Sequence, residues 1–204
     1  MLRQKGIFCK PIKAKRNHDA LAYHGLGNLL AKDEKRRAEA EACYHKAIEL
    51  NPNLTFVYLD LANLLAKDEA RRNEEEACYR RIIEIDPTNT EAYYRLGNLL
   101  AEDGIRAGEA EATYRTMIEI DPSDADAYYS LGNLLFDDKT RAAEAKAFYR
   151  KVIELDPDFY AGAYYNLSLL LAEDEARSGE AETLRRKAIE LDPSLGDDNV
   201  DHSE

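Results

Sequence analysis

The apolar positions along the chain recur with the period of an α-helix. In the third block of sequence, apolar and small residues stand at offsets 0, 3, 4 and 7, on one face of a helix: Tyr93, Leu96, Gly97 and Leu100. A second run has offsets 0, 4, 7 and 8: Ala110, Tyr114, Met117 and Ile118. A proline then ends the second run, because proline lacks an amide hydrogen and disfavours helix in the residue before it. The pattern therefore predicts helix, turn, helix, turn.

The same positions recur in five blocks, so the sequence is a tandem repeat. Prolines close the blocks at intervals of 35, 35, 35 and 36 residues: Pro52, Pro87, Pro122, Pro157 and Pro193. A tyrosine stands in the first helix of each block: Tyr23, Tyr58, Tyr93, Tyr128 and Tyr164. A small residue follows four positions later: Gly27, Ala62, Gly97, Gly132 and Ser168. One helix pair cannot bury both of its apolar faces, so the blocks are expected to stack around a continuous core.

The run Tyr-x-x-Leu-Gly-x-x-Leu, then Ala-x-x-x-Tyr, then Asp-Pro resembles the tetratricopeptide repeat, with tyrosine in place of the usual tryptophan and phenylalanine. The resemblance implies an all-α fold, a right-handed superhelical α-solenoid of five helix-turn-helix repeats over residues 19–193. The repeats are expected at about 19–53, 54–88, 89–123, 124–158 and 159–194. The extra residue, relative to the family's usual 34, falls between the two helices. The pentatricopeptide family, which binds RNA, shares this length. We reject this assignment, because the residues at equivalent positions of the repeats (the columns of the array) are tetratricopeptide-like and the array is acidic.

Charged residues mark the turn between the two helices of each block. An aspartate is followed three residues on by an arginine, which is followed three further on by a glutamate; the aspartates are Asp33, Asp68, Asp103, Asp138 and Asp174. We expect the aspartate to cap a helix and the arginine and glutamate to pair on its surface, in preference to a catalytic pair of carboxylates. In the last block, Arg185 replaces the tyrosine of the second helices. This suits a terminal face that no further repeat covers, and sequence drift is the alternative.

By the resemblance, the first helices line the concave side, and three columns become candidates for a binding groove. The first column is asparagine, whose amide can donate to and accept from a peptide backbone: Asn28, Asn63, Asn98 and Asn133. The alternative is a repeated consensus residue that faces water. The second column is mostly aromatic and could bind a ligand or pack against a neighbouring helix: His24, Leu59, Tyr94, Tyr129 and Tyr165. The third changes from basic to acidic and could orient a charged peptide or only be a solvated helix end: Lys32, Lys67, Glu102, Asp137 and Glu173.

Some tetratricopeptide co-chaperones hold the C-terminal carboxylates of a chaperone with Asn, Lys and Arg on successive first helices. Here His24 and Leu59 stand where the lysine would help, and the third block offers Glu91 and Arg95 where two bases are expected. We therefore expect no tight binding to such tails. In the second block, Glu75 occupies a column that is otherwise alanine, and we expect it to extend to water or to loosen the packing.

The net charge of −12 is unevenly distributed and narrows the function. Residues 1–18 carry +6 and no acid, and the remainder carries −18. We expect 1–18 to be a disordered basic leader and 195–204 a disordered acidic tail. The acidic array makes nucleic-acid binding improbable. No run of about 20 apolar residues could span a membrane, and three cysteines with no metal-ligand spacing indicate no cofactor or metal.

No nucleophile, base or phosphate-binding motif appears, so the chain is not expected to be an enzyme or to bind a small-molecule substrate. The leading hypothesis is an intracellular scaffold or adaptor, most simply cytoplasmic, that binds an extended peptide or helix of a protein partner. A structural or assembly subunit of a larger complex, conceivably in an organelle, is the alternative, prompted by the basic leader and by Phe159 and Tyr160. A regulatory relative of an enzyme that carries such repeats is the third reading.

Overall fold

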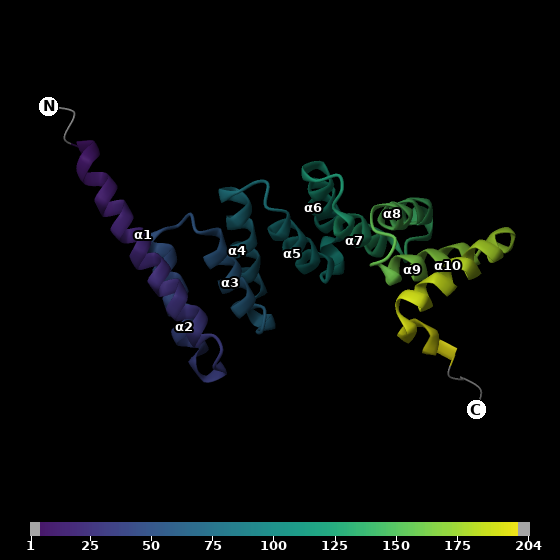
Figure 1. Cartoon of the computed structure of the whole chain (residues 1–204), viewed down its shortest axis with the longest axis horizontal. Helices are drawn as coiled ribbons and strands as arrows, with labels where there is room; N and C mark the ends of the chain where they lie inside the picture. The colour runs from purple at the N-terminus through teal and green to yellow at the C-terminus, as the bar shows by residue number, and fades with distance from the viewer. Residues whose placement is uncertain (1–4, 200–204) are drawn as a thin grey trace. The chain divides into compact units, whose positions relative to one another are not determined.

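The computed structural model describes the backbone of residues 5–199 and the side chains of residues 15–196. Over this range the chain is all-α, with consecutive helices arranged as repeated pairs (Figure 1). The helices are α1 Lys5–Leu30, α2 Arg37–Leu50, α3 Thr55–Leu65, α4 Arg72–Ile85, α5 Thr90–Ala101, α6 Ala107–Ile120, α7 Ala125–Leu135, α8 Ala142–Leu155, α9 Ala161–Ala172 and α10 Ser178–Leu191. The predicted alternation of helix and turn is therefore confirmed.

A short 3-10 helix joins the two α-helices of each pair: η1 Glu34–Arg36, η2 Glu69–Arg71, η3 Gly104–Arg106, η4 Lys139–Arg141 and η5 Glu175–Arg177. The predicted aspartates cap these 3-10 helices, since each side chain accepts a hydrogen bond from the backbone amide two residues on, as Asp33 does from Lys35 at 3.0 Å. The residue before each second α-helix is an arginine that makes no side-chain cap. The side-chain cap therefore belongs to the 3-10 turn and not to the second α-helix.

The arginine of each turn pairs with the glutamate three residues on, as predicted, with Arg36 and Glu39 at 2.7 Å as the first example. Arg71 and Arg141 each also bind a glutamate of the preceding repeat. Arg71 contacts both carboxylate oxygens of Glu41 at 2.7 Å, and Arg141 contacts both of Glu111 at 2.6 and 2.7 Å. Such bidentate pairs fix geometry as well as adding energy, so each ties two successive repeats together.

The chain divides into two compact units, residues 1–96 and 97–204. In the first unit α2 packs against both α1 and α3, and α3 also packs against α4. Helix α3 contributes the largest buried apolar face: Val57, Tyr58, Leu61, Ala62, Leu64 and Leu65. The two described cysteines, Cys43 and Cys78, are free, and burial raises the pKa of the Cys78 thiol to about 12.

In the second unit α6, α7, α8, α9 and α10 pack in sequence order. Its largest fully buried side chains are Tyr149, Leu100, Met117, Leu131, Leu167, Leu171 and Val152. Arg185, which stands in the tyrosine column, lies with its guanidinium 5.7 Å from the centre of the Tyr165 ring. The short helix η6, Pro193–Asn199, packs against α10.

Both ends of the chain differ from the sequence-based expectation where they are described. Residues 5–18, expected to be a disordered leader, form the first half of α1. The Asn17 side chain accepts a hydrogen bond from Asn51 at 2.6 Å, which links this part of α1 to the turn after α2. Residues 195–199 of the expected tail belong to η6, and residues 200–204 lie outside the described part.

Candidate functional site

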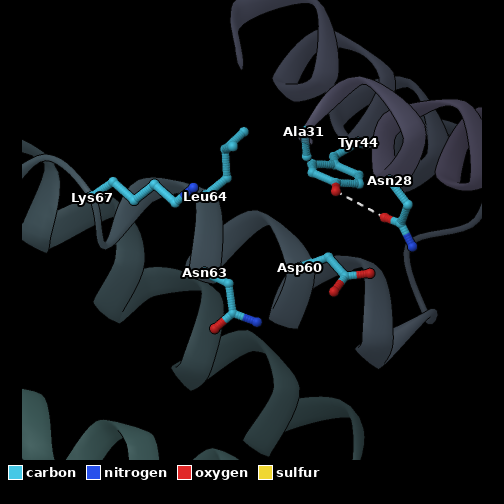
Figure 2. Close-up of a pocket in the computed structure, with 7 residues that line it drawn as sticks. All are labelled: Asn28, Ala31, Tyr44, Asp60, Asn63, Leu64 and Lys67. Atoms are coloured by element: carbon cyan, nitrogen blue, oxygen red, sulfur yellow. Dashed lines mark hydrogen bonds between the residues drawn. The ribbon is translucent and has the colours of Figure 1, made fainter. Parts of the chain in front are cut away.

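A pocket of about 250 Å³ lies where α1 and α3 approach each other in the first unit (Figure 2). Its lining comes from three helices or their C-terminal ends: Asn28, Ala31, Tyr44, Asp60, Asn63, Leu64 and Lys67. Three of the residues that the sequence proposed as binding residues therefore come together here, Asn28, Asn63 and Lys67. Lys32 is exposed and does not line the pocket.

Most of the asparagine column has a structural role inside its own repeat. The Tyr44 hydroxyl donates to Oδ1 of Asn28 at 2.8 Å, as Figure 2 shows. The same bond recurs in the second unit, from Tyr114 to Asn98 at 2.7 Å and from Tyr149 to Asn133 at 2.9 Å. A buried phenol needs an acceptor, and this asparagine supplies it. The carbonyl oxygen of these residues is therefore already used by the fold.

The glycine column places the tyrosine for this bond. A Cβ atom added at Gly27 would lie 2.6 Å from Cε1 of Tyr44, and one added at Gly132 would lie 2.7 Å from Cε1 of Tyr149. The aromatic ring therefore lies directly on the backbone of the first helix. Desolvation of the phenol, followed by the charge of Asp60, raises the pKa of Tyr44 to about 12, so the hydroxyl stays protonated and remains a donor at neutral pH.

The second repeat departs from this arrangement at two linked positions. Ala62 carries a Cβ atom where the glycines have none, so the Tyr79 ring cannot lie on α3 in the same way. Its hydroxyl donates instead to Oε1 of Glu75 at 3.1 Å, and Glu75 is only 8% exposed. Burial and the adjacent carboxylate raise the pKa of Tyr79. The expectation that Glu75 extends to water or loosens the repeat is wrong, because Glu75 supplies the acceptor that Tyr79 needs.

Asn63 is consequently different from its counterparts in the column. It is exposed, lines the pocket, and forms no side-chain hydrogen bond with any residue in the described part of the chain. Both its carbonyl oxygen and its amide hydrogens are available to a ligand.

Asp60 was not identified from the sequence, and it supplies the negative charge of the pocket. Its Oδ2 lies 2.6 Å from Nε2 of His24, which stands one turn before Asn28 on α1. Because a carboxylate can only accept, Nε2 of His24 is the donor in this contact. The His24 ring also makes an edge contact with Phe56, at 4.8 Å between ring centres. His24 therefore orients Asp60 from the α1 side.

The aromatic column packs within the protein in the second unit. The Tyr129 ring lies 5.5 Å from Tyr160 and 6.2 Å from Tyr149, and its hydroxyl approaches Gly162. Tyr160 in turn donates to Asp126 at 2.7 Å. Tyr165 is half-buried beside Arg185, and Tyr94 on α5 is half-buried as well. These contacts favour the packing reading for Tyr129 and Tyr165.

In the second unit, hydrogen bonds between side chains occupy the position that corresponds to the pocket. Asn166, in the same column as Asp60, donates to Oδ1 of Asn133 at 3.1 Å and to the Tyr149 hydroxyl at 3.2 Å. The carbonyl oxygen of Asn133 thus accepts two bonds from the protein. The pocket beside Asp60 and Asn63 therefore depends on residues that differ between these two positions of the array.

The described residues give little support for a carboxylate clamp, a metal site or a membrane-spanning helix. Arg95, a base expected in a carboxylate clamp, is paired with Glu91 at 2.7 Å. Among the described residues no group of three His, Cys, Asp or Glu side chains could hold a metal ion. None of the helices searched over that same range has the length and apolar character needed to cross a bilayer.

Comparison with known proteins identifies the repeat family and similar solved structures. Models of the tetratricopeptide repeat match residues 20–54, 78–112 and 125–159, together just over half of the chain. No curated protein sequence matches it. Among solved structures, YrrB, described as a TPR protein with an unusual peptide-binding site, is 26% identical with a TM-score of 0.66, and the match covers 92% of this chain and 94% of YrrB.

Two further solved structures are similar in fold. MamA is 23% identical, with a TM-score of 0.69, over 90% of this chain and 97% of MamA. PilF of Pseudomonas aeruginosa is 20% identical, with a TM-score of 0.69, over 87% of this chain and 78% of PilF. With the repeat models and the paired helices, these likenesses lead to one conclusion: the chain belongs to the tetratricopeptide repeat family, with an all-α solenoid fold.

Proposed function

We propose that this protein is an adaptor that binds an extended peptide segment of a partner protein in the pocket between α1 and α3. The tetratricopeptide fold supports a protein–protein interaction scaffold in general. The observation that carries the more specific proposal is the uncommitted amide of Asn63. YrrB, of the same fold, is described as having a peptide-binding site, which supports the same class of ligand.

The pocket offers the groups that a peptide backbone requires. The amide of Asn63 donates to a backbone carbonyl and accepts from a backbone amide, so it holds a peptide without reading its side chains. Leu64 and Ala31 supply apolar lining between the polar groups. An extended segment keeps its backbone groups free for such bonds, whereas a helix satisfies them internally. The site therefore favours an extended ligand over a helical one.

A comparison of two asparagine variants tests this function. Peptides that bind the full chain are selected from a displayed random library and titrated calorimetrically. Asn63→Ala is expected to weaken the selected peptides about tenfold, because it removes two hydrogen bonds to the ligand. Asn98→Ala, in the same column, is the matched control: it leaves affinity unchanged and lowers the unfolding midpoint, because the Tyr114 hydroxyl loses its acceptor. Unchanged affinity in Asn63→Ala would reject the proposal.

A further inference from the structure

Three pocket residues lie along α3 and the turn that follows it, with an acidic residue at one end and a basic residue at the other. Asp60, Asn63 and Lys67 stand at offsets 0, 3 and 7, and all three line the pocket (Figure 2). Asp60 and Asn63 belong to α3, which ends at Leu65, and Lys67 lies in the turn after it, seven residues from Asp60. The uncommitted amide of Asn63 lies between them.

Both charges remain available to a ligand. Lys67 is exposed and forms no ion pair within the described part of the chain. The Asp60 side chain remains 34% exposed even though its Oδ2 accepts from His24. A carboxylate has about four acceptor positions on its two oxygens, so one donor from His24 leaves room for a cationic side chain. The pocket can thus hold a positive group at one end and a negative group at the other.

An extended ligand backbone can present charged side chains to both ends of the pocket. In a polyproline II helix, residues i and i+3 lie on the same face and about 9 Å apart, and the backbone makes no internal hydrogen bonds. In a β-strand, side chains on one face are about 7 or 13 Å apart. Either extended conformation can therefore place one charged side chain at each end of the pocket.

Resting on the peptide-binding function proposed above, we infer that the pocket selects an extended segment with a basic and an acidic residue on the face that enters it. The basic side chain pairs with Asp60, the acidic side chain pairs with Lys67, and a backbone carbonyl between them accepts from the Asn63 amide. The alternation of charge distinguishes this site from a clamp for carboxylate tails, which needs positive charge throughout.

Four capped peptides of equal length test the charge preference with the full chain, by calorimetric titration. Their central sequences are Lys-Pro-Pro-Glu, Glu-Pro-Pro-Lys, Lys-Pro-Pro-Lys and Glu-Pro-Pro-Glu. One of the two mixed-charge orders is expected to bind at least about fivefold more tightly than either like-charged peptide, because only it satisfies both ends. The preferred order also reveals the direction of the bound chain.

A charge exchange within the pocket gives the sharper result. The double variant Asp60→Lys, Lys67→Asp is expected to prefer the opposite mixed-charge order. If circular dichroism shows that it does not fold, the exposed single variant Lys67→Gln replaces it and should lose the preference between Lys-Pro-Pro-Glu and Lys-Pro-Pro-Lys. Asp137→Lys is the control, because it changes a charge in the same column outside the pocket.

The outcomes separate this inference from the function on which it rests. Equal binding of all four peptides, with loss in Asn63→Ala, overturns the charge preference and leaves peptide binding standing. No binding of any of the four, while library-selected peptides do bind, has the same meaning. If the double variant prefers the same peptide order as wild type, the inference is also overturned. The residues that recognise the peptide's charges would then lie outside this pocket.

Discussion

At the scale of single residues, a hydrogen bond from a tyrosine hydroxyl to an asparagine recurs in several repeats, and the second repeat lacks it. The sequence identified the asparagine column, but identical residues in that column have different roles. Asn98 and Asn133 accept from buried tyrosines, whereas Asn63 does not, because Ala62 and Glu75 redirect Tyr79. The column alone could not show this, since the cause lies in neighbouring columns that meet only in the folded repeat.

The close approach of tyrosine to glycine predicts a specific stability effect. Gly132→Ala is expected to destabilise the protein by about 1–3 kcal/mol, because the new Cβ would overlap the fully buried Tyr149 ring. Gly108→Ala on α6 is the control, since an added Cβ there meets nothing within 4 Å and alanine favours helix by up to about 1 kcal/mol. Denaturant unfolding of both variants measures the difference. A Gly132→Ala protein as stable as wild type would show that the ring moves away at no cost.

At the scale of elements, the order of helices and turns followed from periodicity, and the contacts between repeats did not. Sequence analysis paired each turn arginine with the glutamate three residues on. It missed the bonds from Arg71 to Glu41 and from Arg141 to Glu111, which join residues 30 positions apart. Those contacts depend on how neighbouring helices are aligned, which the helical period within one repeat does not determine.

The pair of Glu111 and Arg141 predicts a pH dependence. Hydrogen bonds from Arg141, then from Arg115, lower the pKa of Glu111 to about 2. A carboxylate whose pKa is lowered by folding stabilises the folded state above its unfolded pKa, about 4.3, and this contribution is lost progressively as the pH falls through the folded pKa of about 2. Glu111→Gln should therefore cost about 1 kcal/mol at pH 7 and progressively less as the pH falls from about 4 to about 2.

Chemical unfolding of wild type and Glu111→Gln across this pH range provides the measurement. Glu182→Gln is the control, because Glu182 is exposed and pairs with Arg186 only at 3.4 Å. A cost of Glu111→Gln that stays constant with pH would show that the lost interaction is not the ion pair.

At the scale of the whole molecule, the repeated fold carries a pocket formed partly by residues that differ from their counterparts in other repeats. The fold class and the repeats could be predicted, because five blocks carry the same columns. Asp60 could not, because its column holds a different residue in every block: Gly25, Asp60, Arg95, Ser130 and Asn166. A site made by departures from a repeat has no periodic signal, and the pocket between α1 and α3 became visible only when those residues were placed together.

The most direct measurement follows the side-chain amide signals of the asparagine column by nuclear magnetic resonance while a bound peptide is titrated in. The signals of Asn28, Asn63, Asn98 and Asn133 are assigned with the corresponding alanine variants. Binding in the pocket predicts the largest shift for Asn63, a smaller one for Asn28 across the pocket, and none for Asn98 and Asn133, whose carbonyl oxygens already accept from tyrosines. Saturable binding that leaves the Asn63 signal in place would contradict the assignment of this pocket as the peptide site.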